Sequence, residues 1–271
     1  MSVAAGTAVG VSAPRLSQGR AFRAVLRRDL FVTWSELPVF LAQVILQPLF
    51  LLFVFGKVLG SLGYTQNGYA DLLFAGLLAL TAVITGMQTL AFPLVVEFGW
   101  TKEIEDRLLA PMSTALVAGE KVLFATMRAV TATTIMIPVG ILVLGSIPWR
   151  CSGVPLLLFA LVLGSLLGAG LGMVLGTLVV PQRINIVFSL VFTPLLFTGC
   201  SQYPWPSLSR LPWFQVVTAC NPMTYVSESM RAALTPGIPH IHPWICVLVL
   251  VGALLALITI GLRGFYRRAV D

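Results

Sequence analysis

The chain has 271 residues, of which 58% are hydrophobic and only 10% are charged, and its formal net charge is +7. A soluble domain carries about 25% charged residues, so this composition excludes an ordinary soluble fold and predicts an all-α integral membrane protein. No concentrated basic face is visible, so the positive charge favours contact with anionic lipid headgroups over nucleic acid.

The N-terminal segment lacks an apolar stretch ahead of its arginines. We therefore expect residues 1–18 to form a disordered cytoplasmic tail, not a signal peptide. Between residues 19 and 37, apolar residues such as Phe22 alternate with basic ones such as Arg23 and Arg27. This pattern predicts an amphipathic helix over 19–37 that lies in the inner leaflet, with a solvated and partly ordered arm as the alternative.

Apolar windows long enough to cross a membrane recur through the rest of the chain, which we expect to form one transmembrane domain. A spanning helix needs about 20 consecutive apolar residues. The windows predict six spans, at about 38–56, 72–96, 124–147, 154–180, 184–200 and 243–262. The fifth is the shortest, because polar and proline-rich residues follow it.

Lysine and arginine are distributed unequally between the predicted connections. Short cytoplasmic loops retain positive charge. If the N-terminus lies inside, 13 basic residues are cytoplasmic, and the outside keeps only Lys57, Arg150, Arg210 and Arg231. The asymmetry predicts a multi-pass protein of the cell membrane with both termini in the cytoplasm.

The sequence lacks motifs for catalysis and for nucleotide binding. Its two histidines, His240 and His242, have no evident further ligands, and a metal site needs three or four, so we expect no metal. The motifs GxSxG and HExxH do not occur, and the only Gly-Lys pair, Gly56-Lys57, is followed by Val58, which does not fit a P-loop. We expect no enzyme activity, and no ATP bound by that motif.

The four cysteines form no CxxC pair. Cys200 and Cys220 flank one predicted outside segment. They are expected either to remain free thiols or to form a disulfide in an oxidising exterior.

All ten acidic residues lie outside the six windows or at their ends. Ion-coupled transporters usually place carboxylates near the bilayer midplane, where a charge is costly and therefore functional. The distribution thus argues against proton or sodium coupling. A secondary transporter, or an integral membrane enzyme acting on lipids, remains the alternative function.

The longest charged connection runs from Glu97 to Lys121. Within it, Lys102 to Ala110 predicts a short amphipathic helix, capped by Thr101 and stopped by Pro111. Such a helix is suited to docking against another protein. A solvated connector fits the periodicity equally well.

This connection, EFGWTKEIEDRLLAPMSTALVAGEKVL, resembles the cytoplasmic loop of ABC type-2 permeases, a family that includes drug, polysaccharide and lipooligosaccharide exporters. The resemblance implies a coupling helix that contacts an ATPase subunit, through Glu97, Thr101, Glu103, Glu105, Leu108, Leu109 and Pro111. Gly99-Trp100-Thr101 departs from the denser Arg-Glu cluster of many members, which leaves the substrate open.

A second stretch, from Thr198 to Leu234, resembles the outer segment of the same family. Its aromatic, proline-rich composition predicts two short helices that dip into the outer leaflet between spans five and six. Glu228 and Arg231, at i and i+3, are expected to pair on one helical face. The resemblance implies an extracellular gate formed by Pro204, Leu211, Pro212, Trp213, Asn221, Pro222, Tyr225, Glu228 and Arg231.

Four glycines, Gly164, Gly168, Gly172 and Gly176, recur at every fourth residue and predict close helix packing, within one chain or between two. The resemblance implies a homodimer or heterodimer of permeases that binds two ATPase subunits, which hold the ATP and Mg. The function implied is the permease subunit of an ATP-driven exporter, which moves amphipathic, lipid-linked or drug-like substrates out of the cytoplasm or inner leaflet.

Overall fold

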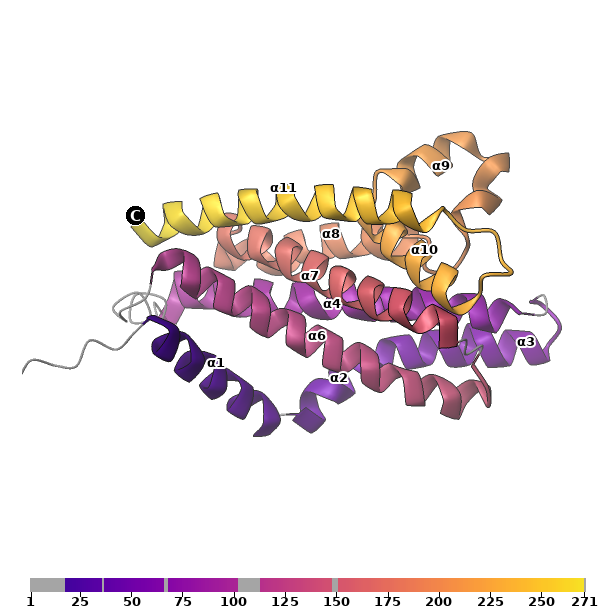
Figure 1. Ribbon diagram of the computed structural model, residues 1–271, viewed down its shortest axis with the longest axis horizontal. Helices are drawn as coiled ribbons and strands as arrows, with labels where there is room; N and C mark the ends of the chain where they lie inside the picture. The colour runs from indigo at the N-terminus through magenta and orange to yellow at the C-terminus, as the bar shows by residue number, and fades with distance from the viewer. Residues whose placement is uncertain (1–17, 36, 66–67, 102–112, 148–150, 271) are drawn as a thin grey trace, which may run out of the picture.

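The computed structural model describes residues 18–35, 37–65, 68–101, 113–147 and 151–270, and this part of the chain is helical with no strand. Its elements are α1 (Gln18–Ser35), α2 (Leu37–Leu51), η1 (Leu52–Val58), α3 (Leu59–Ser61), α4 (Tyr69–Val96), η2 (Glu97–Thr101), α6 (Thr114–Leu144), η3 (Cys151–Gly153), α7 (Val154–Leu178), η4 (Pro181–Arg183), α8 (Ile184–Thr198), η5 (Trp205–Arg210), α9 (Pro212–Ala219), α10 (Pro222–Leu234) and α11 (Pro243–Val270). The predicted all-α class is confirmed for these residues (Figure 1).

Five helices in the described part of the chain are long and apolar enough to cross a membrane. They cover Leu37–Ser61, Tyr69–Gly99, Thr114–Leu144, Cys151–Leu178 and Pro243–Arg268. The first combines α2, the π-helical η1 and α3. The window predicted at 184–200 folds as α8, whose 15 residues fall short of the 17 to 25 that a spanning helix usually needs.

The third membrane-length helix begins earlier than its apolar window predicts. α6 starts at Thr114, ten residues before position 124, and carries Glu120 and Lys121 in its first turns. Both side chains are buried. Two charged residues therefore lie within α6, ahead of position 124, where the apolar window begins.

The predicted amphipathic segment forms α1, which packs beside the first half of α6 (Figure 1). Ala21 is buried there, and Phe22 and Val25 join the same hydrophobic cluster. Arg23 is exposed, and Phe31 is exposed by 74%. The predicted tail, residues 1–18, lies outside the described residues except for Gln18.

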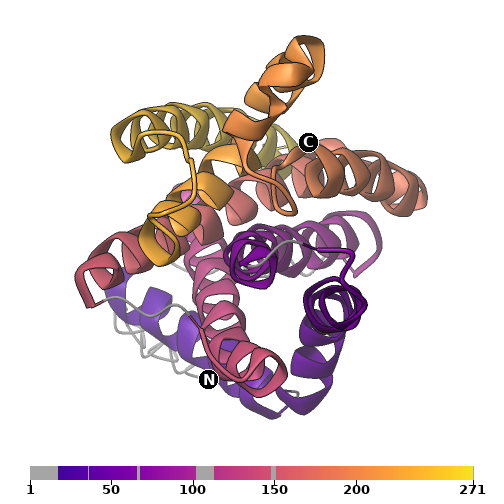
Figure 2. The ribbon, with the colours of Figure 1, turned by 90° about the vertical axis from the view of Figure 1, so that its right-hand side faces the viewer.

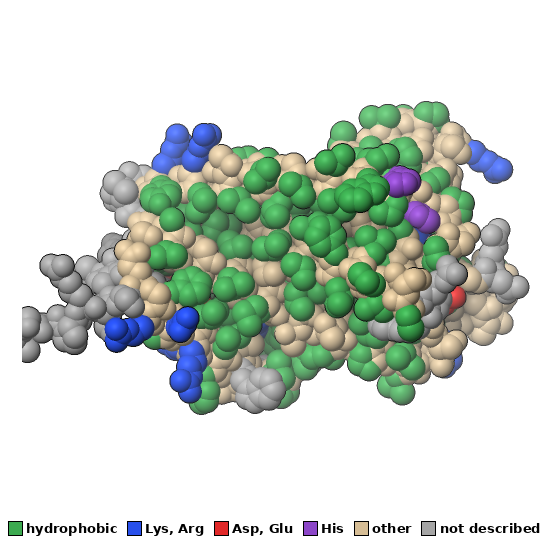
Figure 3. All heavy atoms as spheres, in the orientation of Figure 1, with side chains coloured by type: hydrophobic (Ala, Val, Ile, Leu, Met, Phe, Trp, Pro, Cys, Tyr) green, Lys and Arg blue, Asp and Glu red, His purple; other side chains and the backbone are tan. Residues whose placement is uncertain are grey.

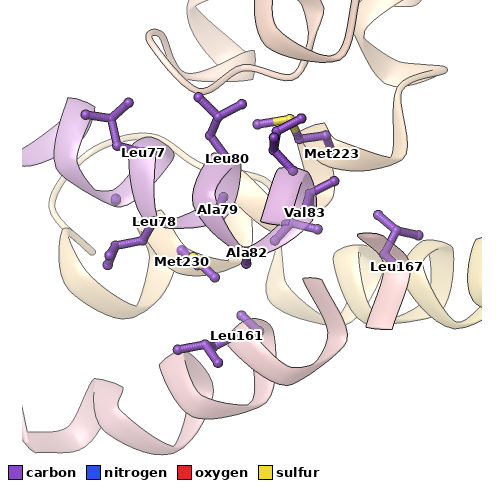
Figure 4. Packing of buried hydrophobic residues seen from close by; sticks show 14 of the residues in the cluster. Leu77, Leu78, Ala79, Leu80, Ala82, Val83, Leu161, Leu167, Met223 and Met230 are labelled. Carbon is purple, nitrogen blue, oxygen red and sulfur yellow. The ribbon is translucent and has the colours of Figure 1, made fainter. Parts of the chain in front are cut away.

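The core surrounds α4, whose side chains are buried along most of its length. α4 packs against α6, α7 and α10, and its contact with α7 is the most extensive of any pair of helices. Figure 4 shows leucines of both helices meeting Met223 and Met230 of α10. α4 is therefore enclosed by neighbouring helices on several sides.

The four recurring glycines of α7 pack within the protomer. A Cβ added at Gly168 would overlap the carbonyl oxygen of Val83 in α4, and one at Gly172 would lie 2.7 Å from that of Met87. Gly176 faces Leu94 in the same way, and Gly164 faces Val226 of α10. The glycines thus let the backbones of α4 and α7 approach closely.

Most of the described lysines and arginines lie at one end of the bundle, and Lys57, Arg210 and Arg231 lie toward the other. Figure 3 shows the larger group beside α1 and the C-terminal turns of α11, with an apolar face along most of the length. We call this the basic end, and the opposite end, where α9 and α10 lie, the distal end. Figure 2 views the distal end, from which α9 projects away from the bundle.

Candidate functional site

Glu228 and Arg231 form an ion pair within α10, and both side chains are fully buried. The predicted i, i+3 pairing is confirmed, because Nη1 of Arg231 donates a hydrogen bond to Oε1 of Glu228. Burying two charges is costly, and their attraction offsets the cost only when further hydrogen bonds satisfy the remaining polar atoms.

Both members of this pair also bind backbone groups of other segments. Oε1 of Glu228 accepts the N–H of Trp205, and Oε2 accepts that of Ile241, each at 2.9 Å. Nη2 of Arg231 donates to the carbonyl oxygen of Cys200 at 2.8 Å. The pair therefore joins α10 to the turn after α8, to the start of η5 and to the entry of α11.

The turn before α10 is fixed by Asn221. Its Oδ1 accepts the backbone N–H of residue 223 at 2.9 Å, and its Nδ2 donates to Oγ1 of Thr198 at 2.9 Å. Pro222 occupies the first helical position, where a missing N–H is tolerated. The Tyr225 hydroxyl donates to the carbonyl oxygen of Ala219 at 2.8 Å. These predicted gate residues form one interlocked unit with the ion pair.

The other predicted gate residues do not belong to this unit. Pro204 is buried just before η5, and Pro212 begins α9. Leu211 and Trp213 are exposed by 50% and 68%. The structure thus divides the predicted gate into a buried hinge on α10 and an exposed apolar arm on α9.

A cavity of about 630 Å³ opens beside this unit at the distal end. Phe55 of η1, Tyr69 of α4 and Tyr203 are among the residues that line it. The Tyr203 hydroxyl donates to the carbonyl oxygen of Phe197. Burial, with a smaller effect of the nearby Cys200 thiol, raises the pKa of Tyr203 to about 12.

At the basic end, Glu97 begins η2 and forms an ion pair with Lys121 of α6, with Oε1 and Nζ 2.6 Å apart. Glu97 is exposed by 8% and Lys121 by 6%. The two residues flank the predicted coupling segment. Their ion pair therefore ties the end of α4 to the start of α6.

η2 also contacts the other elements of the basic end. The ring of Phe98 lies edge to face with that of Phe265 in α11, with centroids 5.3 Å apart. A Cβ at Gly99 would overlap the ring of Pro181 in η4. A side chain at position 99 would therefore displace Pro181 or the backbone of η2. η2 joins α4, α6, α11 and the connection between α7 and α8.

Most predicted coupling residues lie outside the described part of the chain. This applies to Glu103, Glu105, Leu108, Leu109 and Pro111, and to the whole predicted helix Lys102–Ala110. Thr101 is the last residue of η2. The structure therefore describes where the coupling segment leaves α4 and enters α6, and the helix itself stays a prediction.

Sequence reasoning missed Lys121 as the partner of Glu97. The two residues are 24 positions apart, so no helical periodicity connects them. The only signal in the sequence is a lysine followed by a long apolar run, which predicts the cytoplasmic border of a span. The structure shows that this lysine lies inside the helix and is neutralised by an acid from the preceding helix.

The described residues contain no group of three or more His, Cys, Asp and Glu side chains that could hold a metal ion. All four cysteines are free thiols, so Cys200 and Cys220 are not joined. Cys200 is buried and Cys220 is exposed.

Comparison with known proteins identifies the family. Residues 20–235 match the family described as "ABC-2 type transporter". The chain is similar to the protein named "Putative transport permease ycf38" of Cyanophora paradoxa, with 26% identity over 218 residues that cover 76% of this chain and 72% of that protein. The matched region includes the Glu97–Lys121 pair, the predicted coupling segment between them, and the Glu228–Arg231 pair. Since the match covers most of the chain, this protein belongs to the ABC-2 type transporter family.

Proposed function

We propose that this chain is the membrane-spanning permease of an exporter driven by a separate ATPase, and that it moves amphipathic, lipid-linked or drug-like substrates. The single observation that carries the coupling part of this proposal is the buried Glu97–Lys121 pair. It closes the base of the connection that would contact the ATPase. Force applied to residues 102–112 would reach α4 and α6 together, and through η2 it would reach α11 and η4.

We further propose six crossings, with the basic end in the cytoplasm. α7 ends beside η4, and a Cβ at Gly99 in η2 would overlap Pro181, so this connection lies at the basic end. The turn after α8 packs near the other end, where a Cβ at Gly76 would overlap the backbone of Ser201. α8 leads from one region to the other, which supports a short fifth crossing. Charge retention on the cytoplasmic side supports the orientation.

The segment between α8 and α11 is proposed to re-enter the outer leaflet and to gate the pathway. Gly153, just before α7, approaches Ala233 near the end of α10, whereas Gly164 approaches Val226. Gly164 lies 11 residues further along the chain, or roughly 16 Å at 1.5 Å per residue. The start of α10 is therefore deeper in the bundle than its end, as a re-entrant helix requires.

A complete transporter is proposed to contain two permease chains and two ATPase subunits that hold ATP and Mg. The sequence contains no P-loop pattern, which supports assigning nucleotide hydrolysis to another chain. The pathway would lie where two permeases meet. The amphipathic helix predicted at Lys102–Ala110 would dock on the ATPase.

A photo-cross-linking experiment tests this function. A photoreactive residue at Leu108 should capture an ATPase with Walker motifs from native membranes, whereas the same residue at Leu142, exposed by 84% at the end of α6, should not. The permease purified alone should not hydrolyse ATP. Capture of no nucleotide-binding chain at Leu108, or hydrolysis by the isolated permease, would refute the assignment.

A further inference from the structure

Two adjoining cavities form a groove between α2, α4 and α6, well separated from the distal hinge. Their volumes are about 420 and 40 Å³, and they share Gln43 and Gln88 among their lining residues. We call this the polar groove. Its lining includes apolar residues together with the polar side chains of Gln43, Gln47, Thr81, Thr85, Gln88, Thr89 and Arg128.

The polar residues follow the helical period on each wall. Gln43 and Gln47 are four residues apart on α2, and Thr85, Gln88 and Thr89 lie on one face of α4. Each stripe interrupts a span that is otherwise apolar. Among the described residues, the side-chain amides of Gln43, Gln47 and Gln88 form no hydrogen bond with another protein group.

Such an arrangement is costly in a membrane unless it contacts water or a polar ligand. Burying an amide in an apolar medium without a partner costs about 1–3 kcal/mol in proteins. Polar residues within spans accordingly tend to mark substrate pathways. Gln43 and Gln47 are exposed on the protomer surface, and Gln88 is partly exposed, so a ligand can reach all three.

The depth of the groove places it in the half of the membrane nearer the basic end. Arg128 is seven residues beyond Lys121 along α6, and Gln88 is nine residues from Glu97 along α4. At 1.5 Å per residue, Arg128 and Gln88 lie roughly 10 to 14 Å along their helices from the Glu97–Lys121 pair, and the smaller cavity extends further from it. An amphiphile in that leaflet could insert its headgroup here without crossing the bilayer.

Charge and shape select the class of ligand. The guanidinium of Arg128 stacks on the Phe40 ring, 3.9 Å from its centroid, and this contact holds it at the groove. A planar guanidinium with amide and hydroxyl donors around it suits a phosphate or carboxylate.

The neighbouring surface is suited to an apolar tail. Val39, Leu46 and Phe50 of α2 are exposed by 64%, 55% and 59%. They lie within about 60° of Gln43 around the helix, at 100° per residue. A tail along this face would leave its headgroup at the polar groove.

We propose that the polar groove binds the anionic headgroup of an amphiphile, a phosphate or a carboxylate, whose tail lies along α2. This rests on the proposed export function and names the substrate class for it. Arg128 contacts the anion, Gln43, Gln88 and Thr85 supply further hydrogen bonds, and the exposed apolar residues of α2 hold the tail.

Binding is tested on the full chain in phosphatidylcholine nanodiscs, with a fluorescent monoalkyl phosphate as the probe. Dodecyl phosphate and dodecanoate should displace the probe, and dodecylphosphocholine and inorganic phosphate should not. Arg128→Gln should weaken binding about tenfold to hundredfold, the range for a lost charge-assisted hydrogen bond. Gln88→Leu should weaken it severalfold, and Arg128→Lys should restore part of the loss.

Arg263→Gln is the matched control, because Arg263 is an exposed basic residue of α11 outside the groove. Equal weakening in Arg263→Gln and Arg128→Gln would show diffuse attraction to a basic surface and overturn the proposal. Displacement of the probe by inorganic phosphate, at the concentration at which dodecyl phosphate displaces it, would also overturn the proposal. If Arg128→Gln misfolds, Gln43→Leu with Gln88→Leu decides, and unchanged binding there overturns the site.

A second copy of the chain is the competing occupant of this face. The groove would be assigned to a dimer contact if Leu46→Cys cross-links between copies and probe binding is unchanged in Arg128→Gln and Gln88→Leu. Binding is measured without ATPase or ATP. Its failure is therefore distinguishable from failure of the Leu108 cross-linking test.

Discussion

Replacing Lys121 by Met should destabilise the protein and uncouple it from its ATPase. The substitution keeps an unbranched side chain and removes the ammonium, which lies 2.6 Å from Oε1 of Glu97. The carboxylate of Glu97, exposed by only 8%, would remain buried without its counter-charge. Breaking one side of such a pair costs about 3–5 kcal/mol.

A matched set of variants separates the charge effect from packing. Glu97→Gln should lose a similar amount to Lys121→Met, whereas the double variant Glu97→Gln/Lys121→Met should lose less than the sum, because no unpaired charge remains. The exchange Glu97→Lys/Lys121→Glu should recover part of the stability. Each variant is measured by denaturant-induced unfolding of the purified chain.

Coupling is measured on the same variants in the complex with the ATPase. If the pair transmits force to α4 and α6, Lys121→Met should retain ATP hydrolysis and lose transport. The exchange variant should regain part of both stability and transport. Additive effects in the double variant, or normal transport in both single variants, would refute this account of the pair.

Further predictions concern the hinge, the core and the topology. Glu228→Gln should lower the free energy of unfolding by about 3–5 kcal/mol, because Arg231 stays buried without its counter-charge. Trp213→Ala on the exposed arm should change the free energy of unfolding by less than about 1 kcal/mol. Equal shifts of the unfolding temperature in the two variants would contradict the assignment of the hinge to the buried pair. Gly168→Val should cost more than the usual 1–3 kcal/mol of overpacking, because its Cβ meets the Val83 backbone, and Gly252→Ala, with open space around it, is the control for recovery of folded protein. A single cysteine at Ser17 should be labelled only after the membrane is permeabilised, and labelling in intact cells would contradict a cytoplasmic N-terminus.

The apolar windows predicted the membrane-length helices well, because burial in lipid depends on composition and length alone. They did not predict that the helix itself begins at Thr114, ahead of the apolar window, with Lys121 buried in it beside Glu97. The window at 184–200, the shortest of the six, corresponds to α8, which has 15 residues.

The two candidate sites differ in how far the sequence could predict them. The Glu228–Arg231 pair is visible because its members are three residues apart on one helix. Its contacts with Trp205 and Ile241 are not, since they depend on how η5 and the entry to α11 fold over α10. The polar groove could not be predicted from the sequence for a related reason, because Gln43 and Gln88 line one cavity only after α2 packs beside α4.

The central claim is that ATP acts on the distal end through the connection between η2 and α6. It is tested most directly by distance measurements between spin labels at Ser61→Cys and Trp213→Cys in the permease–ATPase complex, with and without ATP. The account predicts an ATP-dependent change in this distance that Leu108→Ala abolishes while hydrolysis continues. A distance between the labels that is the same with and without ATP, or one that changes equally in Leu108→Ala, would contradict the account.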